Sequence, residues 1–356
     1  MVNDVLPATM PVAVYRGGTE VAVEERPVPT PGPGQVLVEV DHCGVCGSDI
    51  HLMVEGWGSP GLVAGHEFAG TVRALGVEVS DWAPGDTVVG GPSPRCGRCR
   101  RCLEGKPSQC EARSEILGGH SDGAFAGYVM SDARALRRVP QGLPPRVAAL
   151  AEPLAVALHG ITRAGVGHED SVMVFGAGPI GALAIAALVA DGRKVSAVEP
   201  SPARRQLAAR LGADPVFEPS ELQRFERWEP ERLVPGAVDA VLECSGKKSA
   251  VELALHQLCR GGRLVLVGAG MEEPSFDPNR VLLNELEICG SFVYDADGFE
   301  RALELLASGR LPADVLIEQD DVTLDELPGA LAGLAAGKIA GKVMVVPRRS
   351  SQGVSN

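Results

Sequence analysis

The sequence lacks the segments that carry a chain into or across a membrane. Residues 1–10 have neither the basic start nor the continuous apolar stretch of a signal peptide. Elsewhere, no apolar run reaches the roughly 20 residues that a membrane-spanning helix needs. We therefore expect a cytoplasmic protein without a membrane partner.

Internal repeats and low-complexity linkers are also absent, and basic residues are outnumbered. The chain has 33 Lys and Arg residues against 46 Asp and Glu residues, which gives a net charge of -13. This negative charge argues against broad attraction to nucleic acids or anionic membranes, although it does not exclude a local basic patch. With 356 residues, 45% of them hydrophobic, the chain can form two domains that each bury a core.

Nine cysteines are present, and four of them are crowded together. Because the cytosol keeps thiols reduced, we expect metal ligands and buried thiols rather than disulfides. The crowded four are Cys96, Cys99, Cys102 and Cys110. Their spacing suits a closed, tetrahedral structural zinc site. An iron-sulfur cluster is an alternative, but its bacterial motif continues with a shorter gap and then Cys-Pro, whereas Glu111 follows here.

Arginines surround these cysteines, which raises the alternative of a nucleic-acid-binding zinc module. They are Arg95, Arg98, Arg100 and Arg101. We expect them instead to offset the negative charge of a zinc ion held by four thiolates. Four free thiols are the remaining alternative, and this density of cysteines makes it the least favoured.

The N-terminal part of the chain reads as a β-rich unit, and the part after about Ala155 as alternating strands and helices. The first part has short runs at 11–15, 35–40, 70–74 and 86–89, separated by Gly and Pro, which is typical of a compact antiparallel barrel. In the second part we predict strands at 171–175, 194–198, 215–217, 238–243, 263–268 and 286–292, with helices at 179–190, 203–211 and 248–259. Six strands with crossover helices predict a doubly wound parallel sheet.

Helix signals and the chain end complete this domain plan. Ser201 is predicted to cap a helix, and Gly212 to end it in a left-handed conformation. A helix at 298–307 and a strand at 342–346 follow the six strands. Because six strands already fill the sheet, we expect a first domain at 1–154, a second at 155–293, and a segment at 294–356 that returns to the first. The final residues, 348–356, are expected to be disordered.

A second set of metal-binding side chains lies near the N-terminus. Cys46 and His66 offer the sulfur and nitrogen ligands that zinc prefers. Glu67 or another carboxylate can complete three protein ligands, and an open fourth position would make the metal catalytic. Cys43 is expected to be a small buried apolar residue.

The motifs around these residues resemble one enzyme family. Gly-Val-Cys-Gly-Ser-Asp-x-His at 44–51 and Gly-His-Glu-x-x-Gly from Gly65 resemble the zinc-dependent alcohol dehydrogenases of the medium-chain dehydrogenase family, and matches extend over nearly the whole chain. The resemblance implies an α/β protein with a GroES-like β-rich catalytic domain and a Rossmann domain. It also implies that the cysteine-rich lobe holds a structural zinc.

The resemblance assigns roles to residues around the catalytic zinc. Cys46 and His66 match the zinc ligands, and Asp49 matches the carboxylate that hydrogen-bonds the ligating histidine. Ser48 and His51 match the hydroxyl and imidazole that relay the substrate proton to water.

The third zinc ligand stays open between two carboxylates. Glu152 falls where some relatives have a zinc-binding cysteine and where the sorbitol, butanediol and threonine dehydrogenase branch has Glu. In that branch, either the equivalent of Glu152 or that of Glu67 contacts the metal. The alternative for Glu152 is an acid favoured by a helix N-terminus.

A glycine-rich turn after the strand at 171–175 predicts a dinucleotide site. The turn is Gly176, Ala177, Gly178, Pro179, Ile180 and Gly181. The first glycine allows the tight turn, the second lets a pyrophosphate approach the backbone, and the third permits close helix packing.

An acid and two arginines bear on which dinucleotide is bound. Glu199 ends the next strand and is predicted to bind the adenosine ribose and repel a 2'-phosphate, so NAD is favoured over NADP. Arg204 and Arg205 are the competing signal because either could attract a phosphate. Glu199 could also be a solvated strand end.

Taken together, these expectations predict an oxidoreductase with one catalytic and one structural zinc. It would transfer hydride between a secondary alcohol, diol or polyol, or the corresponding ketone or aldehyde, and NAD. One alternative is an NADPH-dependent carbonyl reductase of a biosynthetic pathway. The other is a non-catalytic zinc scaffold or nucleic-acid-binding protein, against which the intact Ser48 and His51 argue. The resemblance further implies a homodimer or homotetramer.

Overall fold

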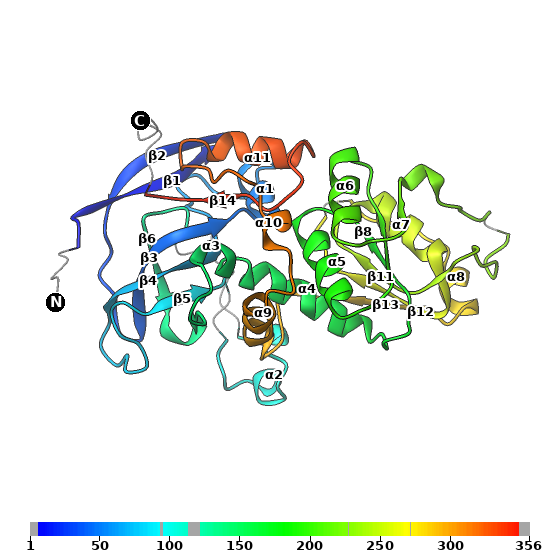
Figure 1. Cartoon of the computed structure of the whole chain (residues 1–356), viewed down its shortest axis with the longest axis horizontal. Coiled ribbons are helices and arrows are strands. Elements are labelled where there is room, and N and C mark those ends of the chain that lie inside the picture. Colours follow the sequence, from blue (N-terminus) through cyan, green and yellow to red (C-terminus); the bar gives the residue numbers. More distant parts are fainter. Residues whose placement is uncertain (1–5, 93–94, 113–121, 227, 271, 349–356) are drawn as a thin grey trace.

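The computed structural model describes residues 6–92, 95–112, 122–226, 228–270 and 272–348 and contains two large sheets (Figure 1). The N-terminal sheet is six-stranded and antiparallel, with the order β14-β3-β4-β5-β7 and β6 paired to β3. Its strands are β3 (Gln35–Gly44), β4 (Glu67–Leu75), β5 (Thr87–Gly90), β6 (Tyr128–Asp132), β7 (Arg137–Arg138) and β14 (Met344–Val345). A two-stranded sheet pairs β1 (Thr9–Gly17) with β2 (Glu20–Pro27). The predicted antiparallel β-rich unit is confirmed.

The second sheet is six-stranded and parallel, with the order β10-β9-β8-β11-β12-β13. Its strands are β8 (Val172–Phe175), β9 (Val195–Val198), β10 (Val216–Phe217), β11 (Val238–Glu243), β12 (Leu258–Leu266) and β13 (Glu287–Gly290). Each of the six predicted strands is present. The order of the strands reverses between β8 and β11, and ligands of doubly wound sheets bind at the carboxyl ends of strands at such a point.

Helices cover the parallel sheet and connect it to the first one (Figure 1). They are α4 (Ala151–Ala164), α5 (Pro179–Ala190), α6 (Pro202–Arg210), α7 (Lys248–Gln257), α8 (Pro278–Leu283) and α9 (Gly298–Ala307). Helix α4 is buried along most of its length, and one hydrophobic core joins it to Val89 of the first sheet and to Val174 of the second. The two sheets therefore share a packed core, which holds them in fixed relation.

The signals at the ends of α6 are only partly confirmed. Ser201 is the residue before the helix, but its hydroxyl donates to the Gly337 carbonyl (3.1 Å) and makes no capping bond. The capping prediction is therefore wrong, because the hydroxyl is hydrogen-bonded to a distant segment of the chain. Gly212 has φ +99, as expected of a residue that leaves a helix in a left-handed conformation.

The remaining elements are short or belong to the C-terminal segment. They are α1 (Gly47–Met53), α2 (Arg100–Leu103), α3 (Pro145–Ala148), α10 (Ala313–Leu316), α11 (Leu327–Ala335) and the 3-10 turns Pro107–Gln109, Ala133–Ala135 and Pro219–Glu221. Strand β14 pairs with β3, so the segment returns to the first sheet. Of the predicted disordered end, all but Arg348 lies outside the described residues. In the part that the structure describes, no helix has the length and apolarity to cross a bilayer.

Candidate metal centres and cofactor cavity

The end of the β3–β4 ladder brings Cys46 and His66 together. Gly44 pairs with Glu67 in the ladder, so both ligand-bearing loops leave the sheet at the same place. The ligand atoms of Cys46, His66 and Glu67 all lie within 4.8 Å of one another. The predicted sulfur, nitrogen and carboxylate set is thus assembled by antiparallel pairing. Cys43, one residue from the ladder's end, is fully buried as expected.

Asp49 links the two loops from a fully buried position. Its carboxylate accepts hydrogen bonds from the Cys46 N–H (2.8 Å) and the Gly65 N–H (3.2 Å). One oxygen lies 3.8 Å from His66 Nδ1, which leaves the other ring nitrogen to face a metal. Asp49 therefore fixes the approach of both ligands.

Glu67 is neutralised by a lysine that no sequence motif indicates. Lys342 Nζ donates to both Glu67 carboxylate oxygens (2.8 and 2.7 Å) and to the Val45 carbonyl (2.9 Å). Both side chains are buried, with exposed fractions of 2% for Lys342 and 0% for Glu67. The one hint of this ion pair in the sequence is that a single lysine stands between Gly341 and the apolar run 343–346.

Glu152 lies in the first turn of α4, and its side chain is buried beside His66 and Glu67. Burial, opposed by the charge of His66 and aided by that of Glu67, raises the pKa of Glu152 to about 7. The site thus gathers three buried carboxylates and a thiol around one lysine, and this excess of acid fits a divalent cation. The donor types are those of a zinc site.

Ser48 and His51 lie on α1, beside this group. The Ser48 Oγ is buried and has no hydrogen-bond partner among the residues that the structure describes. His51 faces the neighbouring cavity. An unpartnered buried hydroxyl next to metal ligands is suited to bind a substrate oxygen.

A cavity of about 360 Å³ lies between α1 and the carboxyl ends of the parallel strands. Its lining includes Gly47, Ile50 and His51 of α1, the glycine-rich turn with Gly176, Gly178 and Pro179, and Glu199, Arg204, Cys244, Ser245, Lys247 and Leu334. Gly47 is the neighbour of Cys46, so the cavity reaches from the dinucleotide turn to the metal group. Its position at the β8–β11 switch point matches a nucleotide site.

The three glycines of the turn are required for different reasons. Gly176 has φ +86, which other residues rarely adopt. A Cβ atom on Gly181 would lie 1.8 Å from the Gly176 carbonyl oxygen, so α5 packs closely against the turn only with glycine there. Gly178 leaves its backbone open to the cavity, as the sequence predicts. Ile180 follows Pro179 in the first turn of α5.

Glu199 is buried, so the alternative of a solvated strand end is wrong. Its carboxylate accepts hydrogen bonds from the Ala177 N–H and the Ser201 N–H, both at 2.8 Å. Arg204 donates to the Leu334 carbonyl (3.1 Å) and also to that of Ile339. The cavity wall at this point therefore presents a fixed acid, whereas the arginine beside it already binds backbone.

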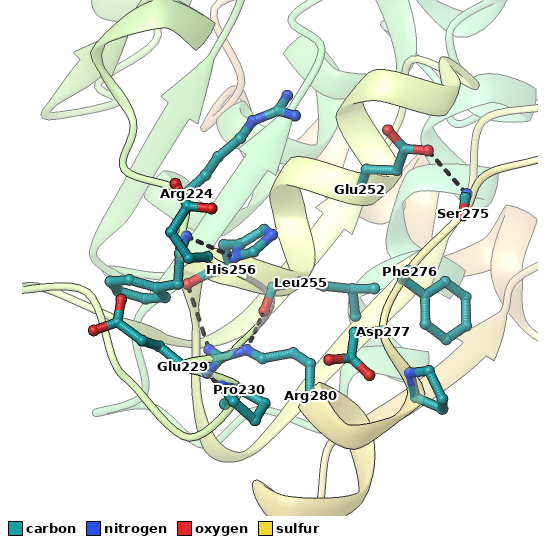
Figure 2. Close-up of a pocket in the computed structure, with 13 residues that line it drawn as sticks. Arg224, Glu229, Pro230, Glu252, Leu255, His256, Ser275, Phe276, Asp277 and Arg280 are labelled. Carbon is teal, nitrogen blue, oxygen red and sulfur yellow. Dashed lines mark hydrogen bonds between the residues drawn. The ribbon is translucent and has the colours of Figure 1, made fainter.

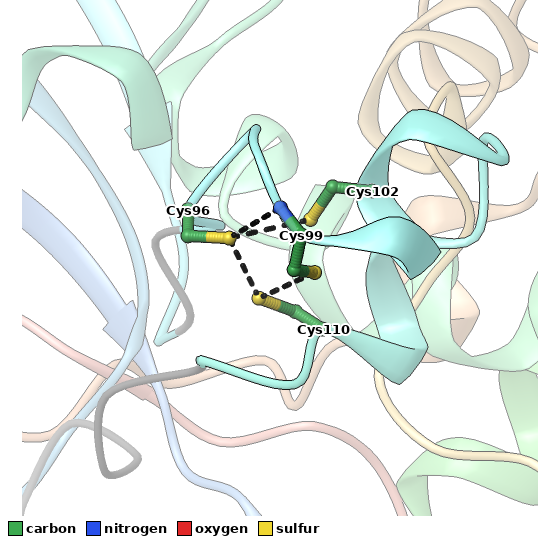
Figure 3. Close-up of side chains that lie close together, drawn as sticks. All are labelled: Cys96, Cys99, Cys102 and Cys110. Atoms are coloured by element: carbon green, nitrogen blue, oxygen red, sulfur yellow. Dashed lines mark hydrogen bonds between the residues drawn. The ribbon is translucent and has the colours of Figure 1, made fainter.

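The four lobe cysteines converge (Figure 3). The Sγ atoms of Cys96 and Cys102 are 3.9 Å apart, those of Cys99 and Cys110 3.9 Å, and those of Cys110 and Cys96 3.5 Å. Four sulfur atoms about 2.3 Å from one tetrahedral zinc would be about 3.8 Å apart. Backbone N–H groups, with that of Cys102 first, lower the pKa of Cys99 to about 6, whereas burial raises the pKa of Cys102 to about 12, so the convergence of the four sulfur atoms is the observation that supports a metal. The lobe fits a closed zinc site.

Three of the four arginines of the lobe make hydrogen bonds or ion pairs with groups other than the cysteines. Arg95 donates to the carbonyls of residues 294–296, and its guanidinium lies 5.1 Å from the centre of the Tyr294 ring. Arg100 and Arg101 contact Glu104 at 3.5 and 3.1 Å. The donors of these three arginines are bonded to carbonyls and a carboxylate, while Arg95 and Cys102 also interact through their charges. The expectation that the arginines offset the thiolate charge therefore stays a prediction.

Comparison with known proteins agrees with this geometry. Residues 32–141 match the family model of the alcohol dehydrogenase GroES-like domain, and residues 179–308 match that of zinc-binding dehydrogenases. The chain is 34% identical to D-xylulose reductase A of Aspergillus oryzae over 337 residues, which cover 91% of this chain and 93% of that one. The chain belongs to the zinc-dependent alcohol dehydrogenases of the medium-chain dehydrogenase family.

Two solved structures show that this dehydrogenase shares the whole architecture. A zinc-binding dehydrogenase of Sinorhizobium meliloti 1021, bound to NADP, superimposes with a TM-score of 0.84 at 32% identity and covers 96% of this chain and 100% of that one. The 2R,3R-butanediol dehydrogenase of Bacillus subtilis gives a TM-score of 0.83 at 30% identity and covers 95% and 100%. The predicted fold class and the assignment as an oxidoreductase acting on CH-OH groups are confirmed.

The dehydrogenase also has a larger cavity of about 480 Å³ in the parallel-sheet half (Figure 2). Arg280 is buried at its base and donates to five carbonyls, those of Pro230, Arg232, Leu255, His256 and Leu258. This guanidinium has no free donor for a ligand, and none of the predicted site residues lines the cavity. Arg280 therefore stabilises the fold at this place.

Proposed function

We propose that this dehydrogenase interconverts a secondary alcohol of a diol or polyol and the corresponding ketone or aldehyde, with NAD as the hydride carrier. The observation that carries the proposal is the cavity that runs from the glycine-rich turn to Gly47, beside the Cys46, His66 and Glu67 group. The names of the similar proteins, a xylulose reductase and a butanediol dehydrogenase, support this substrate class.

In this proposal Cys46, His66 and Glu152 hold the catalytic zinc, and Glu67 stays with Lys342. The reason is hydrogen bonding: Lys342 already donates to both oxygens of Glu67, whereas it acts on the buried Glu152 only through its charge. Cys96, Cys99, Cys102 and Cys110 hold the structural zinc, which gives two zinc ions per chain. When bound, the catalytic zinc supplies a Lewis acid for the substrate oxygen and NAD supplies the hydride acceptor.

The residues of the chain then orient the substrate and remove its proton. The Ser48 Oγ accepts the proton of the substrate hydroxyl, and His51 passes a proton on to solvent. Asp49 keeps His66 in position, while the rigid loop ends set the distance between the substrate carbon and the cofactor.

We infer a preference for NAD from the surroundings of Glu199. Its carboxylate is fixed in the cavity wall and would repel a 2'-phosphate, while Arg204 is held by carbonyls. Arg205 likewise donates to the carbonyls of Glu199 and Pro200. The NADP-bound relative makes an NADPH-dependent reductase the second candidate.

We also propose that the protein is cytoplasmic and forms a homodimer or homotetramer. In each chain, the domain boundaries are placed after residues 154 and 293. All nine cysteines are free, which suits a reducing compartment.

Strand β13 ends the parallel sheet, and no described strand pairs with its outer edge. Exposed apolar side chains flank this edge, namely Leu282, Leu283, Ile288 and Phe292. A second copy could extend the sheet there and cover them.

The test is turnover of zinc-loaded protein with diols, polyols and simple alcohols, each with NAD and NADP, followed by the absorbance of the reduced nicotinamide. We expect activity on diols or polyols with NAD and about two zinc ions per chain. Cys46→Ser should lose one zinc and the activity, whereas the matched control Cys43→Ser should keep both. Activity only with NADPH and ketones would favour the reductase, and no turnover together with tight nucleic-acid binding would favour a scaffold.

A further inference from the structure

His51 has a charged partner just beyond the C-terminal end of α1. Its Nδ1 lies 2.7 Å from a carboxylate oxygen of Glu55, one helical turn further along the chain. The two side chains are 19% and 38% exposed, so the carboxylate is the more solvent-accessible of the two. Both residues line the cofactor cavity.

The Trp57 ring stacks on one face of the His51 imidazole. The two rings stack with centroids 4.8 Å apart and an angle of 16° between their planes. The chain after α1 folds back to allow this, because the Glu55 N–H donates to the Ile50 carbonyl and the Trp57 N–H donates to the His51 carbonyl, both at 3.1 Å. One contact at a ring nitrogen and one over the ring plane leave the imidazole little freedom to rotate.

The contact with Glu55 determines how His51 can carry a proton. A neutral imidazole has one N–H donor and one acceptor nitrogen, and a carboxylate only accepts. The carboxylate therefore selects the form with hydrogen on Nδ1, which leaves Nε2 as the proton acceptor. A proton taken up at Nε2 gives an imidazolium beside a carboxylate, and loss of that proton from Nε2 to water restores the tautomer with hydrogen on Nδ1.

We propose that Glu55 is a positioning residue of the proton path, which sets the tautomer of His51 and stabilises its charged form at the solvent end. The proposal rests on the proposed function, because a proton path matters only if an alcohol is oxidised. The other charged groups on this cavity are Glu199, Arg204, Arg224 and Lys247 of the parallel-sheet half, and Glu55 is the one bonded to His51. From α11 the cavity receives Leu334 and Ala335, which carry no charge.

The experiment compares zinc-loaded wild type, Glu55→Gln, Glu55→Asp, His51→Gln and the double variant His51→Gln/Glu55→Gln. We expect Glu55→Gln to lower kcat for alcohol oxidation about tenfold and to leave KM for NAD within about twofold. The acid limb of its kcat profile should move to lower pH, because an amide stabilises an imidazolium less than a carboxylate does. Glu55→Asp should recover part of kcat.

The double variant separates action through His51 from a general structural effect. If Glu55 acts through His51, Glu55→Gln should cause no further loss in the His51→Gln background. A matched control is Glu252→Gln, which removes the carboxylate of another i,i+4 pair, with Lys248, away from this cavity and should leave kcat unchanged. An unchanged kcat profile in Glu55→Gln, or an equal loss with and without His51, would overturn the proposal.

A second readout works even if no alcohol is turned over. Nitrogen NMR of the histidine rings, with His51→Gln to assign the signal, should show hydrogen on Nδ1 of His51 in the wild type and a mixture of tautomers in Glu55→Gln. The same tautomer in both proteins would refute the role of Glu55. An inactive wild type that shows the expected tautomer change would instead refute the proposed function alone.

Discussion

Replacing Lys342 by Met tests whether the buried ion pair with Glu67 holds the metal site together. Methionine keeps most of the side-chain volume but removes the charge and the three hydrogen bonds of Nζ. Glu67 would then be a carboxylate with no exposed surface and no cation beside it. Removing one partner of a buried pair costs about 3–5 kcal/mol, so we expect a loss of that size in the free energy of unfolding.

The assay is urea unfolding of protein from which the zinc has been removed, so that no metal ion compensates the charge of Glu67, with two control variants. Lys248→Met breaks a half-exposed pair with Glu252 at 3.7 Å and should cost less than about 1 kcal/mol. The double variant Lys342→Met/Glu67→Gln should be less destabilised than Lys342→Met, because the uncompensated charge is then gone. A cost below about 1 kcal/mol for Lys342→Met, or a double variant as unstable as the single one, would refute the reasoning.

Three further perturbations test the metal and cofactor sites. In zinc-free protein, the pKa of Glu152 is about 7 in the folded state against an ordinary 4.5, so its contribution to stability is present below pH 4.5 and is lost as the pH rises through 7. Between these pH values the free energy of unfolding, measured with urea, should fall by about 3 kcal/mol more in wild type than in Glu152→Gln. The same pH dependence of this free energy in both proteins would contradict the prediction. Glu199→Ala should weaken binding of NAD more than that of NADP in fluorescence titrations, and an unchanged preference would remove its role. Cys99→Ser should lower the zinc content by about one ion per chain and the thermal midpoint, and a variant with full zinc content would argue against the lobe as a metal site.

The sequence alone determined the features that depend on short stretches of chain. The glycines of the dinucleotide turn and the closely spaced lobe cysteines were predictable because each set lies within one local segment, where spacing largely fixes geometry. The alternation of strands and helices predicted the parallel sheet for the same reason. Ser48 and His51 followed from a motif of eight residues.

Only the tertiary structure decided which distant groups share a buried space. Lys342 is 275 residues from Glu67, and no local pattern connects them. The hydroxyl of Ser201 and the guanidinium of Arg204 likewise bind carbonyls beyond residue 330, which cancels one predicted cap and anchors Arg204 in the wall of the cavity. A buried polar group needs a hydrogen-bond or ion-pair partner, and the fold determines which group lies close enough to be that partner. That is why the sequence pointed to the candidate site residues, whereas the groups that neutralise and hold them became visible only in the folded chain.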